Sequence, residues 1–397
     1  MRRQKVLITG GTGLLGQYLI RDLLLRGVEP VVLARPNKRM SAVSRVEKIL
    51  RQWEKQLGVN LPLPAVVEGD VSSPGMGLSN SQLDWLGQHC DSVIHSAAVL
   101  QFTANGAEAE PWRTNYHGTR HVLEVTEKLG ISNFHYVSTA YVCGQRTGKI
   151  LENQLDCGQD FRNEYERSKF ETEKLIHENH KIPTKTIYRP AVIVGDSQTG
   201  FTSTFHGLYL YLRLIATLVP MQQRNAQGRI ETPIRLPMNG DEPRNLVPVD
   251  WVSQVITHLF SNPEAHGRTY HLSPDQCITA RQVIDACCEY YNSCGVQFVG
   301  ATQGCDEDND FAARFFENSN IYRSYETSDP IFDKSNLSQF AGELKCPVID
   351  KPMIWRFLEF GRSQRWGKRR ETAVPVVLSK RPEVLAVPSE VLWGERQ

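Results

Sequence analysis

One glycine-rich loop constrains this chain more than any other feature. Residues 5–9 are a run of leucine and β-branched residues, and glycines follow directly before helical periodicity resumes. Gly11, Gly13 and Gly16 match G-x-G-x-x-G, and starting from Gly10 instead gives the looser G-x-x-G-x-x-G. Glycines permit a tight turn, let backbone N–H groups approach a pyrophosphate, and let the next helix pack closely on the strand. The sequence therefore predicts a strand, a phosphate-binding loop and a helix, as in dinucleotide-binding proteins.

A second predicted strand, residues 30–34, is followed by Arg35, where NAD-binding loops carry Asp or Glu. A guanidinium presents a planar fork of donors that a 2′-phosphate can accept, whereas a carboxylate would repel that phosphate. Arg45, on the predicted helix 40–57, is a second candidate ligand, with a solvated surface charge as the alternative. NADP(H) is therefore the expected cofactor.

Composition narrows the class of protein. The 397 residues are 40% hydrophobic and 22% charged, as expected for a globular protein with a full core. The formal net charge of +1 favours neither nucleic acid nor a membrane as the main partner. The N-terminus leads into the first strand without an apolar leader, so we expect a cytoplasmic protein with no stable membrane insertion. The 9 cysteines lack metal-ligand spacing, so we expect free thiols and no metal site.

Strands alternate with helices up to about residue 195, which predicts an α/β fold of Rossmann type, with a doubly wound parallel sheet and a smaller C-terminal region. We expect an NADP-binding domain at 1–200, a substrate-binding region at 201–361, and a basic, proline-interrupted tail at 362–397. Residues about 245–260 should return to the Rossmann core, with Asp250 capping a helix. The expected strands are 5–9, 30–34, 64–68, 92–96, 133–138 and 184–189, and the expected helices are 14–26, 40–57, 79–88, 110–129 and 162–179.

A catalytic pair is predicted on the helix 162–179. Tyr165 and Lys169 stand at i and i+4, one turn apart on one face. A nearby ammonium favours the phenolate and would lower the pKa of Tyr165 from about 10 toward neutrality. Thr139, at the end of a predicted strand, can donate to a developing oxyanion, although a threonine in a strand is commonly a packing residue. For the neighbouring Ser138, a functional and a structural role are equally supported.

The motifs above, with others between residues 70 and 190, make the chain to about residue 290 resemble the extended short-chain dehydrogenase/reductases. The resemblance implies that Asp70 and Val71 border the adenine, that Ala97 and Ala98 line the cofactor channel, and that Lys169 also holds the nicotinamide ribose. The motifs are Thr9-Gly10-Gly11-Thr12-Gly13-Leu14-Leu15-Gly16, Asp70-Val71, His95-Ser96-Ala97-Ala98, Asn115, Ser138-Thr139-Ala140, Tyr165 with Lys169, and Arg189-Pro190. All residues expected at the cofactor are Thr9, Gly10, Gly11, Thr12, Gly13, Leu14, Leu15, Gly16, Arg35, Arg45, Asp70, Val71, Ala97, Ala98, Asn115, Ser138, Tyr165, Lys169, Pro190 and Val192.

Within that superfamily the chain is most similar to the thioester reductase and fatty acyl reductase branch, the male-sterility-like NAD-binding proteins. The stretches 33–35, 137–142 and 189–197 carry this likeness. It implies NADPH-dependent reduction of an acyl thioester, on coenzyme A or a carrier, to an aldehyde or alcohol by Thr139, Tyr165 and Lys169. An acyl carrier protein is a candidate partner, and a homodimer is consistent with the superfamily.

Other functions use the same residues. A ketone or aldehyde reductase acting on a flavonol- or steroid-type substrate would need the same catalytic groups, because the distinction lies in the variable substrate region. Nucleotide-sugar epimerases share the fold, but most carry an acidic residue where Arg35 stands. A regulator that binds NADPH without turnover would often lose Tyr165 or Lys169, which this chain retains. The apolar stretch 205–218 is either an acyl tunnel or lid, or an ordinary core helix.

Overall fold

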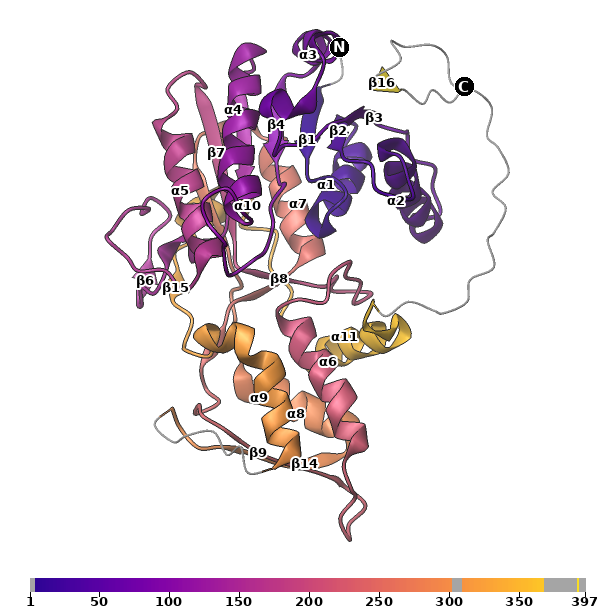
Figure 1. Ribbon diagram of the computed structural model, residues 1–397, viewed down its shortest axis with the longest axis vertical. Coiled ribbons are helices and arrows are strands. Elements are labelled where there is room, and N and C mark those ends of the chain that lie inside the picture. Colours follow the sequence, from indigo (N-terminus) through magenta and orange to yellow (C-terminus); the bar gives the residue numbers. More distant parts are fainter. Residues whose placement is uncertain (1–3, 302–308, 368–390, 393–397) are drawn as a thin grey trace.

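The computed structural model describes residues 4–301, 309–367 and 391–392. These residues form two lobes (Figure 1). The upper lobe contains a parallel sheet with helices on both faces, and the smaller lower lobe is mostly helical. We refer to these as the upper and lower lobes throughout.

The sheet of the upper lobe has parallel strands in the order β12-β7-β5-β4-β1-β2-β3, and a short strand, β16, pairs antiparallel with β3. This order is that of doubly wound dinucleotide-binding sheets, in which the strand order reverses between β1 and β4. The expected α/β fold of Rossmann type is confirmed. The strands are β1 (Lys5–Thr9), β2 (Glu29–Ala34), β3 (Ala65–Glu68), β4 (Ser92–His95), β5 (Asn133–Val137), β7 (Thr184–Pro190), β12 (Thr269–Leu272) and β16 (Val391–Leu392).

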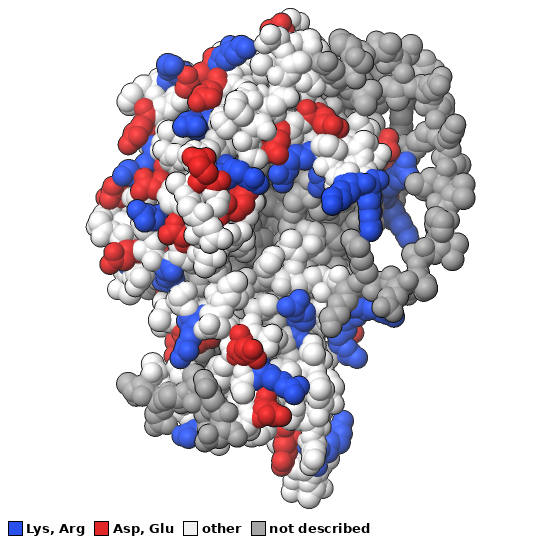
Figure 2. Space-filling model, in the orientation of Figure 1, with Lys and Arg blue, Asp and Glu red and all other residues white. Residues whose placement is uncertain are grey.

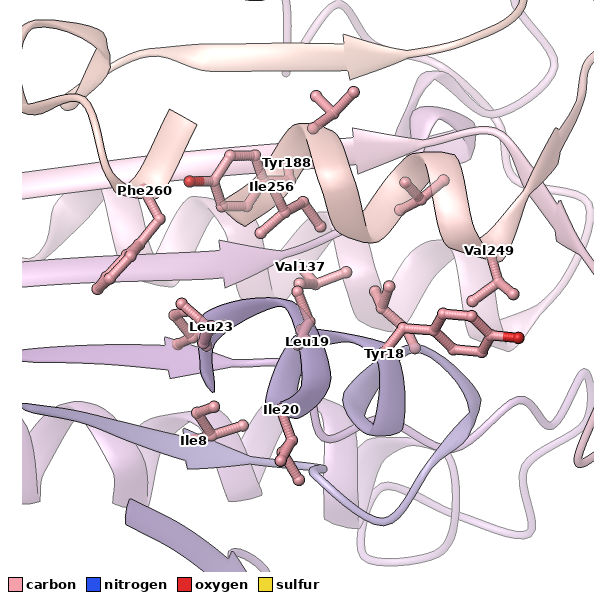
Figure 3. Close-up of a cluster of buried hydrophobic side chains, with 14 of the residues drawn as sticks. Ile8, Tyr18, Leu19, Ile20, Leu23, Val137, Tyr188, Val249, Ile256 and Phe260 are labelled. Atoms are coloured by element: carbon pink, nitrogen blue, oxygen red, sulfur yellow. The ribbon is translucent and has the colours of Figure 1, made fainter. Parts of the chain in front are cut away.

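Helices cover both faces of this sheet. On one face lie α1 (Leu14–Leu25), α2 (Ala42–Leu57) and α7 (Val249–Phe260), and on the other lie α3 (Asn80–His89), α4 (Gly118–Lys128) and α5 (Glu164–Glu178). In β1, Val6 and Ile8 pack toward α1 while Leu7 packs toward the opposite face. Figure 3 shows the core between the sheet and the helices α1 and α7, where Leu19 of α1 and Ile256 of α7 approach each other over the sheet. Because both faces are buried, the strands are continuous apolar runs in the sequence.

The predicted elements of the first 195 residues are all present. The strands agree with the prediction to within one residue at each end, and most helices to within two. The helix expected at 110–129 differs at its start, because residues 113–117 form a π-helical turn, η2 (Arg113–His117), before α4 begins. Such turns insert an extra residue into a helix and are frequent at functional sites.

The lower lobe has its own hydrophobic core. Its α6 (Leu208–Leu218) buries Tyr209, Leu212 and Ile215 against the other helices. Most of the apolar stretch 205–218 is therefore part of the core of this lobe. The other elements are β9 (Ile230–Leu236), α8 (Ala280–Tyr291), β14 (Ser293–Phe298), α9 (Asp310–Ser319), η6 (Asn320–Tyr325) and α11 (Lys351–Ser363). The helix α11 runs past residue 362, where we expected the tail to begin, and Lys368–Arg370 lie outside the described residues.

Short pairings join the lobes. The strand β8 (Val192–Val194) pairs with β11 (Leu246–Pro248), after which α7 returns to the upper lobe and packs on α1. The prediction that Asp250 caps α7 is wrong, because Pro248 is the N-cap. The Asp250 carboxylate instead accepts hydrogen bonds from the backbone N–H (2.8 Å) and hydroxyl (2.6 Å) of Ser197. The remaining elements are β6 (Lys149–Ile150), β10 (Pro243–Arg244), β13 (Ile278–Thr279), β15 (Ile331–Phe332) and α10 (Ser335–Ala341).

Two features are absent from the described residues. No helix there combines the length and the apolar character needed to cross a membrane. Within the same residues, no group of three or more His, Cys, Asp and Glu side chains is arranged to hold a metal ion.

A buried ion pair joins β7 to α5. The Arg189 Nε donates to the Glu173 carboxylate at 2.8 Å, and the two side chains are 1% and 0% exposed. Arg189 also donates to the carbonyl of Gln154 at 2.8 Å, and Glu173 accepts a 2.7 Å hydrogen bond from Ser138. Burial alone would raise the pKa of Glu173, but the charge of Arg189 and three hydrogen bonds lower it to about 2. The carboxylate is therefore ionised inside the protein and depends on its partners.

Replacing Arg189 by Met should leave this carboxylate buried without its counterion. We expect Arg189→Met to reduce the free energy of unfolding by about 3–5 kcal/mol, measured by urea denaturation. Lys181→Met removes an ion pair at the surface, between Glu127 and a Lys181 side chain that is 79% exposed. This substitution should change the free energy of unfolding by less than about 1 kcal/mol. Equal effects of the two substitutions would contradict the assignment of Arg189 as a stabilising core residue.

Candidate active site

The glycine loop lies between β1 and α1. Gly10 has φ of +74°, and a Cβ there would lie 2.5 Å from the backbone N of Ala97. A Cβ on Gly16 would lie 2.1 Å from the carbonyl oxygen of Gly10, so the start of α1 packs directly on the loop. The N-cap of α1 is Gly13, which offers no side-chain cap to the first amides of the helix. This cradle fits a phosphate group, because those amides are donors without intrahelical partners.

Two arginines lie beside this loop. Arg45 on α2 donates to the Thr12 hydroxyl at 2.8 Å and to the carbonyl of Arg35 at 2.5 Å. Arg35 itself is 3.3 Å from the Asp70 carboxylate, and its side chain is 54% exposed. Burial, and then the positive charge of Arg35, lower the pKa of Arg45. Figure 2 shows Lys and Arg side chains gathered near α2, at the level where the two lobes meet. The corner at the end of β2 therefore offers two guanidiniums to an anion.

The residues expected at the adenine follow β3. Asp70 accepts hydrogen bonds from the backbone N–H (2.9 Å) and hydroxyl (2.6 Å) of Ser72. Burial would raise the pKa of Asp70, but these bonds and the charge of Arg35 hold it below its ordinary value. Val71 is buried, and its carbonyl lies 3.0 Å from Nδ1 of His121. Asp70 is therefore an ionised, fixed acceptor beside Arg35.

A hydrogen-bonded chain links β1 to α4 behind the loop. The Thr9 hydroxyl lies 2.5 Å from Nδ1 of His95, whose Nε2 lies 2.9 Å from the Thr119 hydroxyl. Burial, and then the charge of Lys169, lower the pKa of His95 to about 3, so its imidazole is neutral. The Ala97 N–H is 3.4 Å from the Thr9 hydroxyl. These hydrogen bonds fix the segment around Ala97, whose backbone lies close to Gly10.

Asn115, in the π-helical turn, braces the loop after β4. Its side-chain amide exchanges hydrogen bonds with Val99, accepting from the N–H at 2.8 Å and donating to the carbonyl at 3.1 Å. The same amide donates to the Ser168 hydroxyl on α5 at 3.0 Å. Asn115 thus holds the loop that contains Ala97 and Ala98 against the helix that contains Tyr165.

The predicted catalytic pair, Tyr165 and Lys169, lies in the N-terminal half of α5. The Lys169 ammonium is 2% exposed and donates to the Val137 carbonyl at 2.7 Å and to the Tyr136 hydroxyl at 2.9 Å. Burial lowers the pKa of Lys169 to about 7, although the charge of Glu173 opposes this. Tyr165 is half-buried, and its hydroxyl makes no hydrogen bond within the described residues.

The predicted lowering of the Tyr165 pKa is not observed. Burial, and then the negative charge of Glu166, raise the pKa of Tyr165 above its ordinary value. The ammonium of Lys169 is directed at the end of β5 instead. Tyr165 is therefore a protonated phenol at neutral pH in this structure, and acts more readily as a donor than as a base.

Thr139 and Ser138 follow β5 but have different partners. Thr139 caps a short helix, η3 (Ala140–Cys143), by accepting a 3.3 Å hydrogen bond from the Tyr141 N–H. Its hydroxyl hydrogen remains available for an acceptor. Ser138 donates to Glu173, which supports the structural reading of that residue.

The last two expected cofactor residues lie where the sheet meets the lower lobe. Pro190 ends β7 opposite Leu272, and the Val192 N–H donates to the Asn245 carbonyl at 3.0 Å. Most of the predicted site residues lie at or just beyond the carboxyl ends of the strands, whereas Arg45, Asn115, Tyr165 and Lys169 lie on helical elements further along the chain. Sequence reasoning missed Tyr136 and Glu173, although Glu173 stands four residues after Lys169 and so on the same face of α5.

A family of known proteins shares this arrangement of motifs. The family model described as male sterility protein matches residues 8–256, more than half of the chain. The chain belongs to this NAD-binding family. The expected place in the extended short-chain dehydrogenase/reductases, in the thioester reductase branch, is thereby confirmed.

The curated relatives of this chain include much longer proteins. It is 27% identical over 279 residues to a linear gramicidin synthase of Brevibacillus parabrevis, a match covering 68% of this chain and 5% of the relative. It is 28% identical over 286 residues to the L-2-aminoadipate reductase of Penicillium chrysogenum, in its large subunit, covering 66% of this chain and 19% of the relative. The chain thus spans less than a third of either relative.

Solved structures share the fold of this family member over almost its whole length. The terminal R domain from the myxalamid PKS-NRPS biosynthetic pathway superposes with a TM-score of 0.72 at 24% identity, covering 92% of both chains. A thiolation-reductase di-domain from an archaeal non-ribosomal peptide synthetase superposes with a TM-score of 0.70 at 19% identity, covering 93% of this chain and 77% of the other. Both lobes are therefore part of the shared architecture.

Gly10→Ala tests the nucleotide cradle. Gly10 and Gly27 share a positive φ, of +74° and +76°, but nothing lies within 4 Å of a Cβ on Gly27. Each substitution should cost about 1 kcal/mol of backbone strain, and Gly10→Ala should in addition abolish nucleotide binding by displacing Ala97. Binding is measured by the fluorescence of NADPH, and stability by thermal unfolding. Unchanged binding in Gly10→Ala would contradict the role of this loop.

Proposed function

We propose that this protein uses NADPH to reduce an acyl thioester to an aldehyde, or further to an alcohol. The observation that carries the proposal is the Tyr165 phenol, whose hydroxyl makes no hydrogen bond within the described residues, at the edge of a sheet whose glycine loop and arginines fit a dinucleotide phosphate. The names of similar proteins support it, since these include an aminoadipate reductase and the terminal R domain of a biosynthetic pathway.

The residues present fit a nicotinamide dinucleotide with a 2′-phosphate. The loop between Gly10 and Gly16 would hold the pyrophosphate, and Arg35 with Arg45 would hold the 2′-phosphate. When bound, the reduced cofactor supplies a hydride to the carbonyl carbon of the substrate. Asp70 would remain an acceptor for the adenosine side of the site.

The protein's own contribution is to stabilise and protonate oxygen. As charge develops on the carbonyl oxygen, the hydroxyls of Tyr165 and Thr139 would donate hydrogen bonds to it. When the resulting tetrahedral adduct collapses, the carbon–oxygen double bond re-forms and the carbon–sulfur bond breaks. The departing thiolate takes up a proton from the medium, and the aldehyde remains. If a second hydride is added, Tyr165 would give its proton to the oxygen and the alcohol forms. The buried Lys169 is held at this end of β5 by its hydrogen bonds to Val137 and Tyr136, and by family resemblance would hold the ribose.

The substrate would reach the site on coenzyme A or on an acyl carrier protein. One structural neighbour is itself a thiolation-reductase di-domain, which supports a carrier-bound substrate. A cytoplasmic location and a homodimer remain predictions from the sequence.

Arg45→Ala tests the preference for NADPH. Loss of one charge-assisted phosphate contact, worth about 1.5–3 kcal/mol, should raise the KM for NADPH by about 10- to 100-fold and leave the KM for NADH unchanged. Arg51 lies on the same helix and pairs with Glu47, so Arg51→Ala should change neither value. The measurement is steady-state kinetics with each cofactor. A parallel rise for both cofactors would show that Arg45 does not contact a 2′-phosphate.

Tyr165→Phe and Thr139→Ala test the reaction. We expect NADPH oxidation with acyl-CoA substrates to be lost in Tyr165→Phe and reduced by about 10²- to 10³-fold in Thr139→Ala, because each removes a donor to the oxyanion. Thr217 is an exposed threonine on α6, and Thr217→Ala should retain full activity. Oxidation is followed at the absorbance band of NADPH. Turnover with aldehydes or ketones but never with thioesters would make the protein a carbonyl reductase instead.

A further inference from the structure

A short helical segment of the lower lobe reaches the upper lobe around Tyr165. Tyr325, at the end of η6, accepts a 2.7 Å hydrogen bond from the Asn163 side chain. Its ring centroid lies 5.4 Å from the guanidinium of Arg162 and 5.9 Å from the ring of Tyr141, which it meets edge to face. Contacts of this kind fix both the position and the tilt of an aromatic ring.

A second tyrosine of η6 is held from two further sides. The ring of Tyr322 meets that of Phe102, in the loop after β4, edge to face at 5.2 Å. Its hydroxyl accepts a 2.9 Å hydrogen bond from the Gly207 N–H at the start of α6, and its ring lies 6.1 Å from Tyr211. The rings of Phe102 and Tyr325 are also 5.6 Å apart. Phe102, Tyr322 and Tyr325 thus form one cluster, which we call the aromatic wall.

The anchors of this wall are the residues that flank Tyr165. Asn163 is the N-cap of α5 and accepts a 3.0 Å hydrogen bond from the Glu166 N–H, while the Glu164 N–H donates to the Phe102 carbonyl at 3.0 Å. Tyr165 lies in the same turn. The negative charge of Glu166 is, after burial, the largest influence on the pKa of Tyr165 and also on that of Tyr325. Because Asn163 and Glu164 contact Tyr325 and Phe102, the wall lies beside the turn of α5 that contains Tyr165.

Each ring of the wall is half-buried, so part of its surface faces open space. The lower lobe also has an apolar cavity between α6, α8 and α9, lined by residues such as Ile215, Ile234 and Phe315, but its volume is about 30 Å³. That is room for about one or two water molecules, not for an acyl chain. An acyl group beside Tyr165 would therefore lie against surfaces such as the aromatic wall and not in this cavity.

We propose that Phe102, Tyr322 and Tyr325 receive the acyl group of the substrate and select acyl groups that end in an aromatic ring over saturated chains with the same number of carbon atoms. The placement of an acyl group beside Tyr165 rests on the proposed function. The selectivity follows from geometry, because offset and edge-to-face ring pairs gain about 0.5–1.5 kcal/mol beyond the burial of apolar area, or about 3- to 10-fold in affinity.

The test is calorimetric binding of two unreactive thioethers, S-(2-phenylethyl)pantetheine and S-octylpantetheine, to the full chain with NADP⁺ present. The two carry the same number of carbon atoms beyond sulfur, and apolar burial alone favours the octyl compound. We expect the phenylethyl compound to bind more tightly, by less than the roughly 3- to 10-fold that ring pairing alone provides, because greater burial of the octyl chain offsets part of that gain. Tyr322→Leu should reverse this order, whereas Tyr322→Phe, which retains the ring, should keep it.

Two further variants sharpen the result. Phe102→Leu, in the loop after β4, should also reverse the order and replaces Tyr322→Leu if that variant does not fold. Tyr290 contacts Trp355 and Glu359 in the lower lobe, so Tyr290→Leu should leave the preference unchanged. An equal or tighter affinity for the octyl compound, an unchanged preference in both wall variants, or no binding of either compound would overturn the proposal.

The reduction assay separates this inference from the proposed function. If thioesters are never reduced but the phenylethyl preference depends on Tyr322 and Phe102, the proposed reaction fails and the aromatic wall stands. If thioesters are reduced without any such preference, the reaction stands and the aromatic wall fails.

Discussion

The buried ion pair between Arg189 and Glu173 is the interaction on which the site depends. Two charges without access to water require close mutual geometry, because an unpaired charge in the core is strongly destabilising. The pair therefore fixes α5 on β7, and Glu173 also holds Ser138 at the end of β5. Lys169 stands one turn before Glu173 on the same helix, and Tyr165 one turn before Lys169. This ionic contact thus helps to position the proposed catalytic groups on α5.

The two lobes divide the chemistry between them. The upper lobe provides the groups proposed to serve the cofactor and the reaction, namely a glycine loop, two arginines beside it, and a phenol one helical turn from a lysine. In the proposed reaction, the lower lobe would meet the rest of the substrate through η6, whose Tyr322 contacts both Gly207 at the start of α6 and Phe102 of the upper lobe. This division explains why the cofactor half was recognisable from short motifs, while the substrate half carries the differences between functions.

The sequence predicted those features that depend on local spacing. The strands lie within one residue of prediction because the parallel sheet buries both faces and makes each strand a continuous apolar run. The glycines and the Tyr165–Lys169 spacing were likewise readable, since turn geometry and helix periodicity connect nearby residues.

Features that depend on distant segments could not be predicted. The pKa of Tyr165 is set by burial, which no local pattern reports. Asp250 resembles a helix cap in sequence, yet it binds Ser197, 53 residues away. Tyr325 meets Asn163 across 162 residues, so the aromatic wall exists only once both lobes have folded.

The measurement that tests this account most directly is the ratio of free thiol released to NADPH oxidised with a purified acyl-CoA substrate. Thioester reduction predicts one thiol per substrate molecule, with one NADPH oxidised if the product is the aldehyde and two if it is the alcohol. Both signals should disappear together in Tyr165→Phe. Oxidation of NADPH without release of thiol, or release of thiol without oxidation, would contradict the proposed reaction.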